Sequence, residues 1–190
     1  MDYKIYQSDL ILKNHKVFVN ECFKLYNLLK ERYDISDTTW AYNKYNIFVE
    51  TSTSILFYKL YKELNYYIRD FIKDDRPLWM RSWLNYHLDN NHLQKSLGNK
   101  AGFHFHHSSY HGYISIDPQD TVTKFRNGLE VKNKIGQLYI GPGNKGNQEN
   151  DSWDHYVNII SPSSNPRITI AFDLIVEHNI VTNPNYFPIL

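Results

Sequence analysis

The chain changes its texture at Pro77, and this change constrains the fold more than any other feature. Beyond it, short runs that alternate apolar and polar residues are separated by Gly, Pro, Asn and Asp. Alternation with a period of two places every second side chain on one face of a strand, so each run predicts a β-strand. The runs cover residues 78–88, 102–107, 110–116, 121–125, 129–131, 137–140, 156–160 and 167–176. Many short strands at this spacing predict an antiparallel sandwich or barrel.

Two segments before Pro77 show the three- and four-residue spacing of apolar side chains that is typical of amphipathic helices. They span residues 14–33 and about 54–73. The Ser and Thr residues at 51–54 can cap the second helix, because a hydroxyl oxygen accepts a hydrogen bond from a free backbone N–H group. We therefore expect a helical N-terminal part that packs against a jelly-roll-like β core.

These patterns also divide the chain into parts. A chain of 190 residues can bury a core of ordinary size, and we expect it to form a single domain. Its expected parts are the helical part at residues 1–76, the β core at 77–178 and an irregular tail at 179–190. Polar stretches at 89–100 and 141–151 predict surface loops, and loops carry specificity on such scaffolds.

Composition and charge exclude several classes of protein. The net charge is +1 and no run of Lys and Arg occurs, so neither nucleic acid nor an anionic membrane is expected as a partner. Cys22 is the only cysteine, which excludes an internal disulfide and a cysteine zinc cluster and favours a cytoplasmic location. No run approaches the length of a membrane span, and the N-terminus lacks an apolar signal core. The aromatic helices could serve a homodimer interface, so the oligomeric state stays open.

Histidines cluster in the first part of the expected β core. In a strand, His104 and His106 share one face, with their Cα atoms about 6–7 Å apart. Both rings can then reach one metal ion at roughly 2.1 Å. A third ligand must come from a neighbouring strand, and His155 is the best candidate because it stands at the edge of one. The alternative is a chance cluster of hydrogen-bonded histidines, and His107 and His111 are expected at the surface or behind the ligands.

An arginine on a later strand adds to this pattern. Arg167 and Thr169 share one face of the run at 167–176, and Ile168 faces the opposite side. An arginine inside an apolar barrel is costly unless it meets a carboxylate, and no acidic residue shares this face before Asp173. The pattern therefore indicates an acidic ligand, and the alternative is an exposed strand end with Arg167 in an ion pair at the rim.

The order of these motifs resembles that of the iron(II)- and 2-oxoglutarate-dependent oxygenases. The resemblance covers roughly residues 78–176 and is closest to uncharacterised members carried by tailed phages of marine cyanobacteria and their bacterial relatives. The motifs that carry it are Trp83-Leu84-Asn85, His104-Phe105-His106, residues 111–118, residues 136–142, His155 and Arg167-Ile168-Thr169. Membership would imply a double-stranded β-helix that binds Fe(II) and uses O2 and 2-oxoglutarate to oxidise a further substrate, in the host cytoplasm if the protein is phage-encoded.

The same resemblance implies roles for individual residues. His104 and His155 would be iron ligands, and Arg167 would bind the distal carboxylate of 2-oxoglutarate through two hydrogen bonds. Thr169 would add a further hydrogen bond to that carboxylate. Either of two tyrosines would also contact 2-oxoglutarate, and these are Tyr113 and Tyr139. The expected activity is a hydroxylation coupled to the oxidative decarboxylation of 2-oxoglutarate, with a primary substrate that the sequence does not identify.

One position departs from the family. Its members usually carry a carboxylate ligand two residues after the first histidine, where this chain has His106. A neutral imidazole leaves the site one negative charge short. Either His106 ligates iron in a three-histidine site, which we favour, or a carboxylate such as Asp117 or Asp154 takes its place, or catalysis is lost. The rival classes are a non-catalytic, cupin-like binding protein and a three-histidine zinc hydrolase.

Overall fold

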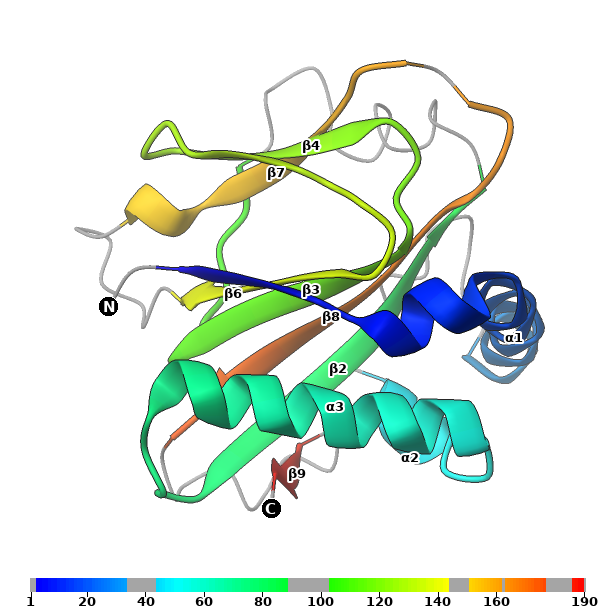
Figure 1. Ribbon diagram of the computed structural model, residues 1–190, viewed down its shortest axis with the longest axis horizontal. Coiled ribbons are helices and arrows are strands. Elements are labelled where there is room, and N and C mark those ends of the chain that lie inside the picture. The colour runs from blue at the N-terminus through cyan, green and yellow to red at the C-terminus, as the bar shows by residue number, and fades with distance from the viewer. Residues whose placement is uncertain are drawn as a thin grey trace.

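Two antiparallel sheets form the β part of the computed structural model, which describes residues 3–33, 44–88, 103–143, 151–161, 163–176 and 186–189 (Figure 1). The helices are α1 (Asp9–Tyr33), α2 (Ile47–Glu50) and α3 (Ile55–Ile72), with a 3-10 turn at Asp151–Trp153. The strands are β1 (Lys4–Gln7), β2 (Leu78–His87), β3 (Tyr110–Asp117), β4 (Thr121–Phe125), β5 (Glu130–Lys132), β6 (Gln137–Pro142), β7 (His155–Ile159), β8 (Arg167–Ile175) and β9 (Phe187–Ile189).

The strand order identifies the architecture. The larger sheet has the order β1-β6-β3-β8-β2-β9 and the smaller one the order β5-β4-β7. A single bridge between His104 and His155 adds the segment around His104 to the free edge of β7. The chain thus alternates between the sheets from β2 to His104, back to β3, on to β4 and β5, and then through β6, β7 and β8. This is a double-stranded β-helix, and it confirms the predicted jelly-roll core with N-terminal helices.

The central strands β6, β3, β8 and β2 of the larger sheet are buried on both faces, and one face belongs to the core whereas the other lines a pocket. Along β8, Ile168 and Phe172 belong to the core that the sheet shares with the helices, whereas Arg167 and Thr169 line the pocket on the other face. Helix α1 contacts β2 and β3, and Figure 1 shows α3 running across the sheet. Asn46, which caps α2, also donates to the Met80 carbonyl of β2 at 3.1 Å. The helices therefore cover one face of the larger sheet, and the pocket lies on the opposite face.

Most of the sequence-based boundaries are confirmed. The seven strands from β2 to β8 lie within two residues of the predicted runs, and α3 begins after the predicted cap Ser54. Helix α1 begins at Asp9, earlier than predicted, and has a kink at Asn14, whose side chain donates to the Leu10 carbonyl at 2.8 Å. That bond competes with regular helical pairing at the kink.

Three expectations were wrong. Residues 103–107 form no continuous strand, because the chain turns after the His104 bridge and the Ser108 N–H donates to the His106 carbonyl. The tail is not wholly irregular, since β9 pairs with β2 at the sheet edge, where its Pro188 is tolerated. The helical part also contains β1, whose residues are mostly exposed and so show no alternation.

The first predicted loop lies wholly outside the described residues, and the second lies there in large part. Residues 89–100 and 144–150 lie outside the described residues. Gly141 and Pro142 extend β6, so the second loop begins later than predicted. None of the helices in the described ranges is long and apolar enough to cross a membrane.

Burial on α3 predicts how much the helical layer contributes to stability. Leu60 is fully buried, and Leu60→Ala should lower the free energy of unfolding by about 2–5 kcal/mol, because it removes apolar contacts and leaves a cavity. Leu28 on α1 is 43% exposed, so Leu28→Ala should cost less than about 1 kcal/mol. Urea denaturation followed by circular dichroism measures both. Equal losses for the two variants would contradict the packing described.

Candidate metal centre

Three histidines converge between the smaller and the larger sheet. His104, His106 and His155 each offer one ring nitrogen, and these nitrogens lie within 4.8 Å of one another. Ligands of one first-row ion at roughly 2.1 Å stand about 3.0–3.4 Å apart, so small adjustments would complete a site. Two backbone hydrogen bonds hold His104 against His155, at 3.0 and 3.1 Å. The structure thus brings together all three histidines that the sequence singled out.

Hydrogen bonds at the far side of two rings fix which nitrogen faces the cluster. His106 Nδ1 lies 2.7 Å from the carboxylate oxygen Oδ1 of Asp173. His155 Nδ1 lies 3.3 Å from the backbone carbonyl of Trp153. A carboxylate and a carbonyl can only accept, so each Nδ1 carries a proton, and in the neutral ring Nε2 then has a free lone pair. Rings held in this way are typical of metal ligands.

The electrostatics of the cluster favour a neutral ring at His155. Burial lowers the pKa of His155 well below its usual value, and charge on His104, His111 or His106 would lower it further. A metal ligand must be an unprotonated imidazole, so this environment favours the binding form. Imidazole nitrogens suit several first-row ions, iron among them. The donor set therefore fits the Fe(II) that the sequence predicts, although it does not select iron over zinc.

The two carboxylates considered as replacements for His106 lie elsewhere. Asp117 accepts a hydrogen bond from Gln119, and Asp154 lies 3.4 Å from Arg126 in an ion pair. Neither belongs to the cluster, and the metal-binding group found among the described residues contains histidines only. Of the alternatives that the sequence left open, the geometry therefore favours His106.

A fourth histidine lies against the cluster. His111 is 2% exposed, and its ring stacks on His106 and His155 with centroid distances of 4.7 and 4.9 Å. Neither ring nitrogen makes a hydrogen bond of normal geometry within the described residues. Burial, and then the charge of His106, lower the pKa of His111 well below its usual value. The sequence placed His111 at the surface or behind the ligands, and its burial excludes the surface.

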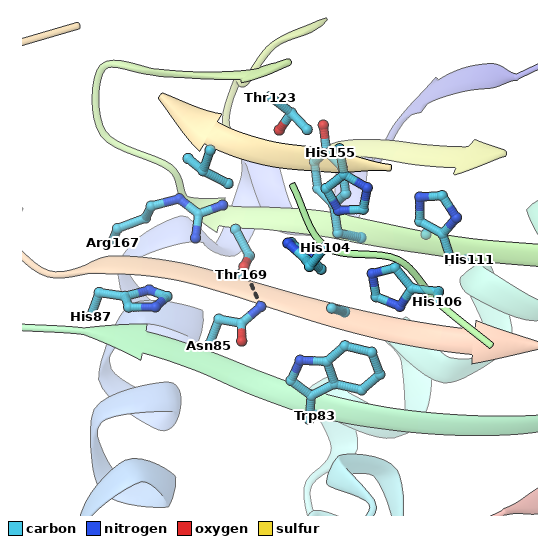
Figure 2. Close-up of a pocket in the computed structure, with 14 residues that line it drawn as sticks. Trp83, Asn85, His87, His104, His106, His111, Thr123, His155, Arg167 and Thr169 are labelled. Atoms are coloured by element: carbon cyan, nitrogen blue, oxygen red, sulfur yellow. Dashed lines mark hydrogen bonds between the residues drawn. The ribbon is translucent and has the colours of Figure 1, made fainter. Parts of the chain in front are cut away.

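A pocket extends from the histidines toward the start of β8 (Figure 2). It encloses about 700 Å³ of empty space, including the part that is open to solvent. Besides the three histidines, its wall consists of Trp83, Asn85, His87, His111, Gly112, Tyr113, Thr123, Val157, Arg167, Thr169 and Ala171. No Asp or Glu stands among these lining residues. The wall is thus mixed apolar and hydrogen-bonding, with one fixed cation.

That cation, Arg167, is buried, and the described part of the chain offers it no countercharge. The side chain is 4% exposed, and no carboxylate in the described part of the chain forms an ion pair with it. Its Nε has no hydrogen-bond partner within the same residues. Burial lowers the pKa of the guanidinium to about 10, so it stays charged at neutral pH. The alternative of an ion-paired arginine at an exposed strand end is therefore wrong, and the site has the charge to bind an anion.

The other predicted cosubstrate residues separate into two groups. Thr169 lines the pocket, and its hydroxyl oxygen accepts a hydrogen bond from Asn85 Nδ2 at 3.3 Å, which leaves its own hydrogen to donate. Tyr113 also lines the pocket and donates to Asn133 at 3.0 Å. Tyr139 is not among the lining residues and stacks behind Tyr113 at 5.4 Å. Tyr113 is thus the better placed of the two tyrosines.

Sequence reasoning missed several lining residues. His87 and Thr123 had no role assigned, and Asn85 was noted only as part of a motif. The signal was present for β2, since alternation places Trp83, Asn85 and His87 on one strand face. Thr123 could not have been found in this way, because its position depends on how the smaller sheet folds over the larger one.

Comparison with solved structures supports the fold. The viral collagen prolyl hydroxylase of Paramecium bursaria Chlorella virus 1 superimposes with a TM-score of 0.59 over 94% of this chain and 91% of that chain, at 11% identity. Its 2OG complex gives 0.53 over 94% and 97%, at 10% identity. A full-length Neurospora crassa protein in complex with alpha-KG matches 52% of this chain and 34% of that chain, with a TM-score of 0.35 and 14% identity. No family model and no curated protein matches the sequence.

The cluster predicts metal-dependent stabilisation. Co(II) at a hundred times its dissociation constant should raise the unfolding free energy by about 2.7 kcal/mol, and a chelator should reverse the effect. His155→Ala should abolish the stabilisation, because it removes one of three nitrogens. Thermal unfolding with and without Co(II) measures both.

His107→Ala is the matched control, because His107 is exposed and outside the cluster. It should respond to Co(II) like the unsubstituted protein. If His155→Ala kept the full response, the metal would have to bind elsewhere.

Proposed function

We propose that the protein is an Fe(II)- and 2-oxoglutarate-dependent dioxygenase that hydroxylates a substrate still to be identified. The observation that carries this proposal is the charge of Arg167, which is buried in the pocket that the three histidines also line and is compensated by no described carboxylate. A structural metal site has no use for such an arginine. A cosubstrate with a metal-chelating end and an anionic end would use both groups at once.

2-Oxoglutarate has this chemistry, because it is a dicarboxylate with a keto group beside one carboxylate. Arg167 would bind the distal carboxylate through two charge-assisted hydrogen bonds, and the Thr169 hydroxyl would donate a third. Asn85 holds the Thr169 oxygen and so orients its hydrogen. The keto acid end would then lie toward the histidines. A viral prolyl hydroxylase of the same fold has been solved with 2OG bound, which supports this assignment.

His106 and His155 would hold Fe(II) through Nε2, and His104 would hold it through one of its ring nitrogens. Bound iron would supply the activation of O2 that couples the conversion of 2-oxoglutarate to succinate and CO2 with oxidation of the substrate. The protein positions the cosubstrate and keeps water away from it. Part of the pocket wall is apolar and would exclude water, and it consists of Trp83, Val157 and Ala171. The relationship to phage-encoded members and the cytoplasmic location stay predictions of the sequence.

A second candidate is a non-catalytic protein of the same fold that binds a metal and an acidic ligand. The observation that favours it is His106 in the place of the usual carboxylate ligand, which leaves iron with one more positive charge. A three-histidine zinc hydrolase is a further alternative, and it would need a general base near the metal, a role that the sequence assigns to no residue. Succinate formation from 2-oxoglutarate distinguishes the first candidate from both.

Removal of the arginine charge should selectively weaken cosubstrate binding. Under anaerobic conditions, Fe(II) followed by 2-oxoglutarate should produce a weak visible charge-transfer band. Arg167→Met should raise the 2-oxoglutarate concentration needed for half of the band by roughly 30-fold or more, since a buried charge pair is lost. Affinity for the metal alone should change little.

Arg76→Met serves as the control, because Arg76 lies on the surface and pairs with Asp74. It should leave the titration unchanged. A band of unchanged midpoint in Arg167→Met would remove Arg167 from the cosubstrate site. A band without succinate formation in air would favour the binding protein over the oxygenase.

A further inference from the structure

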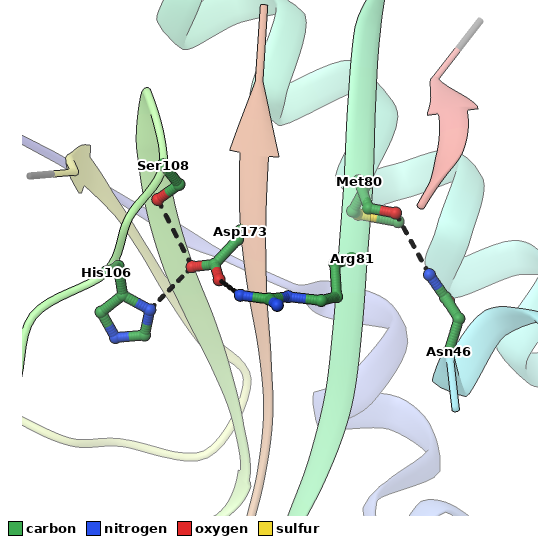
Figure 3. A network of polar contacts seen from close by, with 6 residues as sticks. All are labelled: Asn46, Met80, Arg81, His106, Ser108 and Asp173. Carbon is green, nitrogen blue, oxygen red and sulfur yellow. Dashed lines mark hydrogen bonds and ion pairs between the residues drawn. The ribbon is translucent and has the colours of Figure 1, made fainter. Parts of the chain in front are cut away.

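A buried carboxylate lies directly behind His106 (Figure 3). Asp173 of β8 is 1% exposed, and its Oδ1 lies 2.7 Å from His106 Nδ1. Ser108 Oγ makes a longer hydrogen bond of 3.4 Å to the same oxygen. The second oxygen, Oδ2, lies 2.5 Å from a guanidinium nitrogen of Arg81. Asp173 thus faces the candidate metal centre with one oxygen and an arginine with the other.

The register of the larger sheet fixes this carboxylate. Asp173 stands opposite Arg81 on β2 and opposite His111 on β3. It also shares its strand face with Arg167, because the two positions differ by an even number of residues. Arg81 and Asp173 therefore form a cross-strand ion pair, whereas Arg167 on the same face has no such partner among the described residues. The ion pair keeps Asp173 ionised and oriented.

The ring of His106 needs such support, because its segment is not a strand. Its ring stacks on Trp83 at 5.9 Å with an interplanar angle of 17°, and on His111 at 4.7 Å with an angle of 5°. Figure 2 shows Trp83 and His111 on opposite sides of the ring. These contacts restrict the plane of the ring. The bond to Asp173 then decides its rotation and its tautomer within that plane.

We propose that Asp173 is a positioning residue of the metal centre, which holds His106 as an Nδ1-protonated ligand and supplies negative charge from behind it. This inference rests on the proposed metal site. An ionised carboxylate that accepts a hydrogen bond from Nδ1–H makes the imidazole a stronger electron-pair donor at Nε2. In the family pattern a carboxylate ligand brings its negative charge directly to the metal. Here the carboxylate of Asp173 would act through the imidazole of His106, which lies between it and the metal. Arg81 in turn orients Asp173.

Asp173→Asn tests the role of this charge, because Asn has nearly the same size and keeps an acceptor for Nδ1–H. In the absence of 2-oxoglutarate, the variant should bind Co(II) about 10- to 100-fold more weakly than the unsubstituted protein. Competition with a chelating dye measures the affinity, and the visible Co(II) spectrum reports the ligand geometry. Asp120→Asn, at a partly exposed aspartate that binds Ser161, should change neither.

The same substitution in a His106→Asp variant distinguishes a positioning role of Asp173 from a merely structural one. In His106→Asp the position carries the usual carboxylate, which has no ring nitrogen to be held. Asp173→Asn should then cause no loss of Co(II) affinity, because it only removes a nearby like charge. An equal loss in both backgrounds, or no loss in the unsubstituted background, would overturn the proposal. Failure of the unsubstituted protein to bind Co(II) at all would contradict the metal site itself.

A measurement on the unsubstituted protein covers the case in which Asp173→Asn does not fold. Nitrogen-15 NMR of the histidine rings with Zn(II) bound reports which nitrogen carries the proton. We expect His106 to show a protonated Nδ1 and a metal-bound Nε2. A metal-bound Nδ1, or a ring without metal contact, would overturn the role of Asp173. Neither experiment involves 2-oxoglutarate, so both are independent of the cosubstrate assignment.

Discussion

The paired backbone hydrogen bonds between His104 and His155 are the constraint on which the rest of the site depends. They attach an otherwise irregular segment to the edge of β7 and so extend the smaller sheet. Because the segment is fixed there, His106 reaches across to Asp173 in the larger sheet. The histidine cluster therefore spans both sheets of the β-helix. Loss of this pairing would separate the three rings even if each sheet stayed intact.

Charge balance explains why this pocket suits an anion. The cations and anions on the inner face of the larger sheet are not matched, since Arg81 is neutralised by Asp173 and Arg167 is not neutralised by any described carboxylate. A buried, uncompensated arginine is expensive, and proteins retain such groups where a ligand completes them. Burial meanwhile lowers the pKa of His155 and of His111 and so favours their neutral form. The pocket thus offers neutral donors at one end and a fixed positive charge at the other.

The residues of the candidate site could be predicted from the sequence more fully than the contacts that hold those residues in place. Period-two alternation located β2 to β8, and the spacing of His104 and His106 identified the cluster although their segment proved not to be a strand. Contacts that depend on sheet register could not be predicted, and the pairing of His106 with Asp173 is the main example. Short edge strands such as β1 and β9 were missed because pairing with a neighbour, not their own pattern, makes them strands.

The central claim is that one cosubstrate connects the histidine cluster with Arg167. A crystal structure of the protein grown anaerobically with Fe(II) and 2-oxoglutarate tests it most directly. We expect iron on Nε2 of His106 and His155 and on a ring nitrogen of His104, with the distal carboxylate of 2-oxoglutarate paired with Arg167. Iron held by other residues, or 2-oxoglutarate bound away from Arg167, would contradict the account.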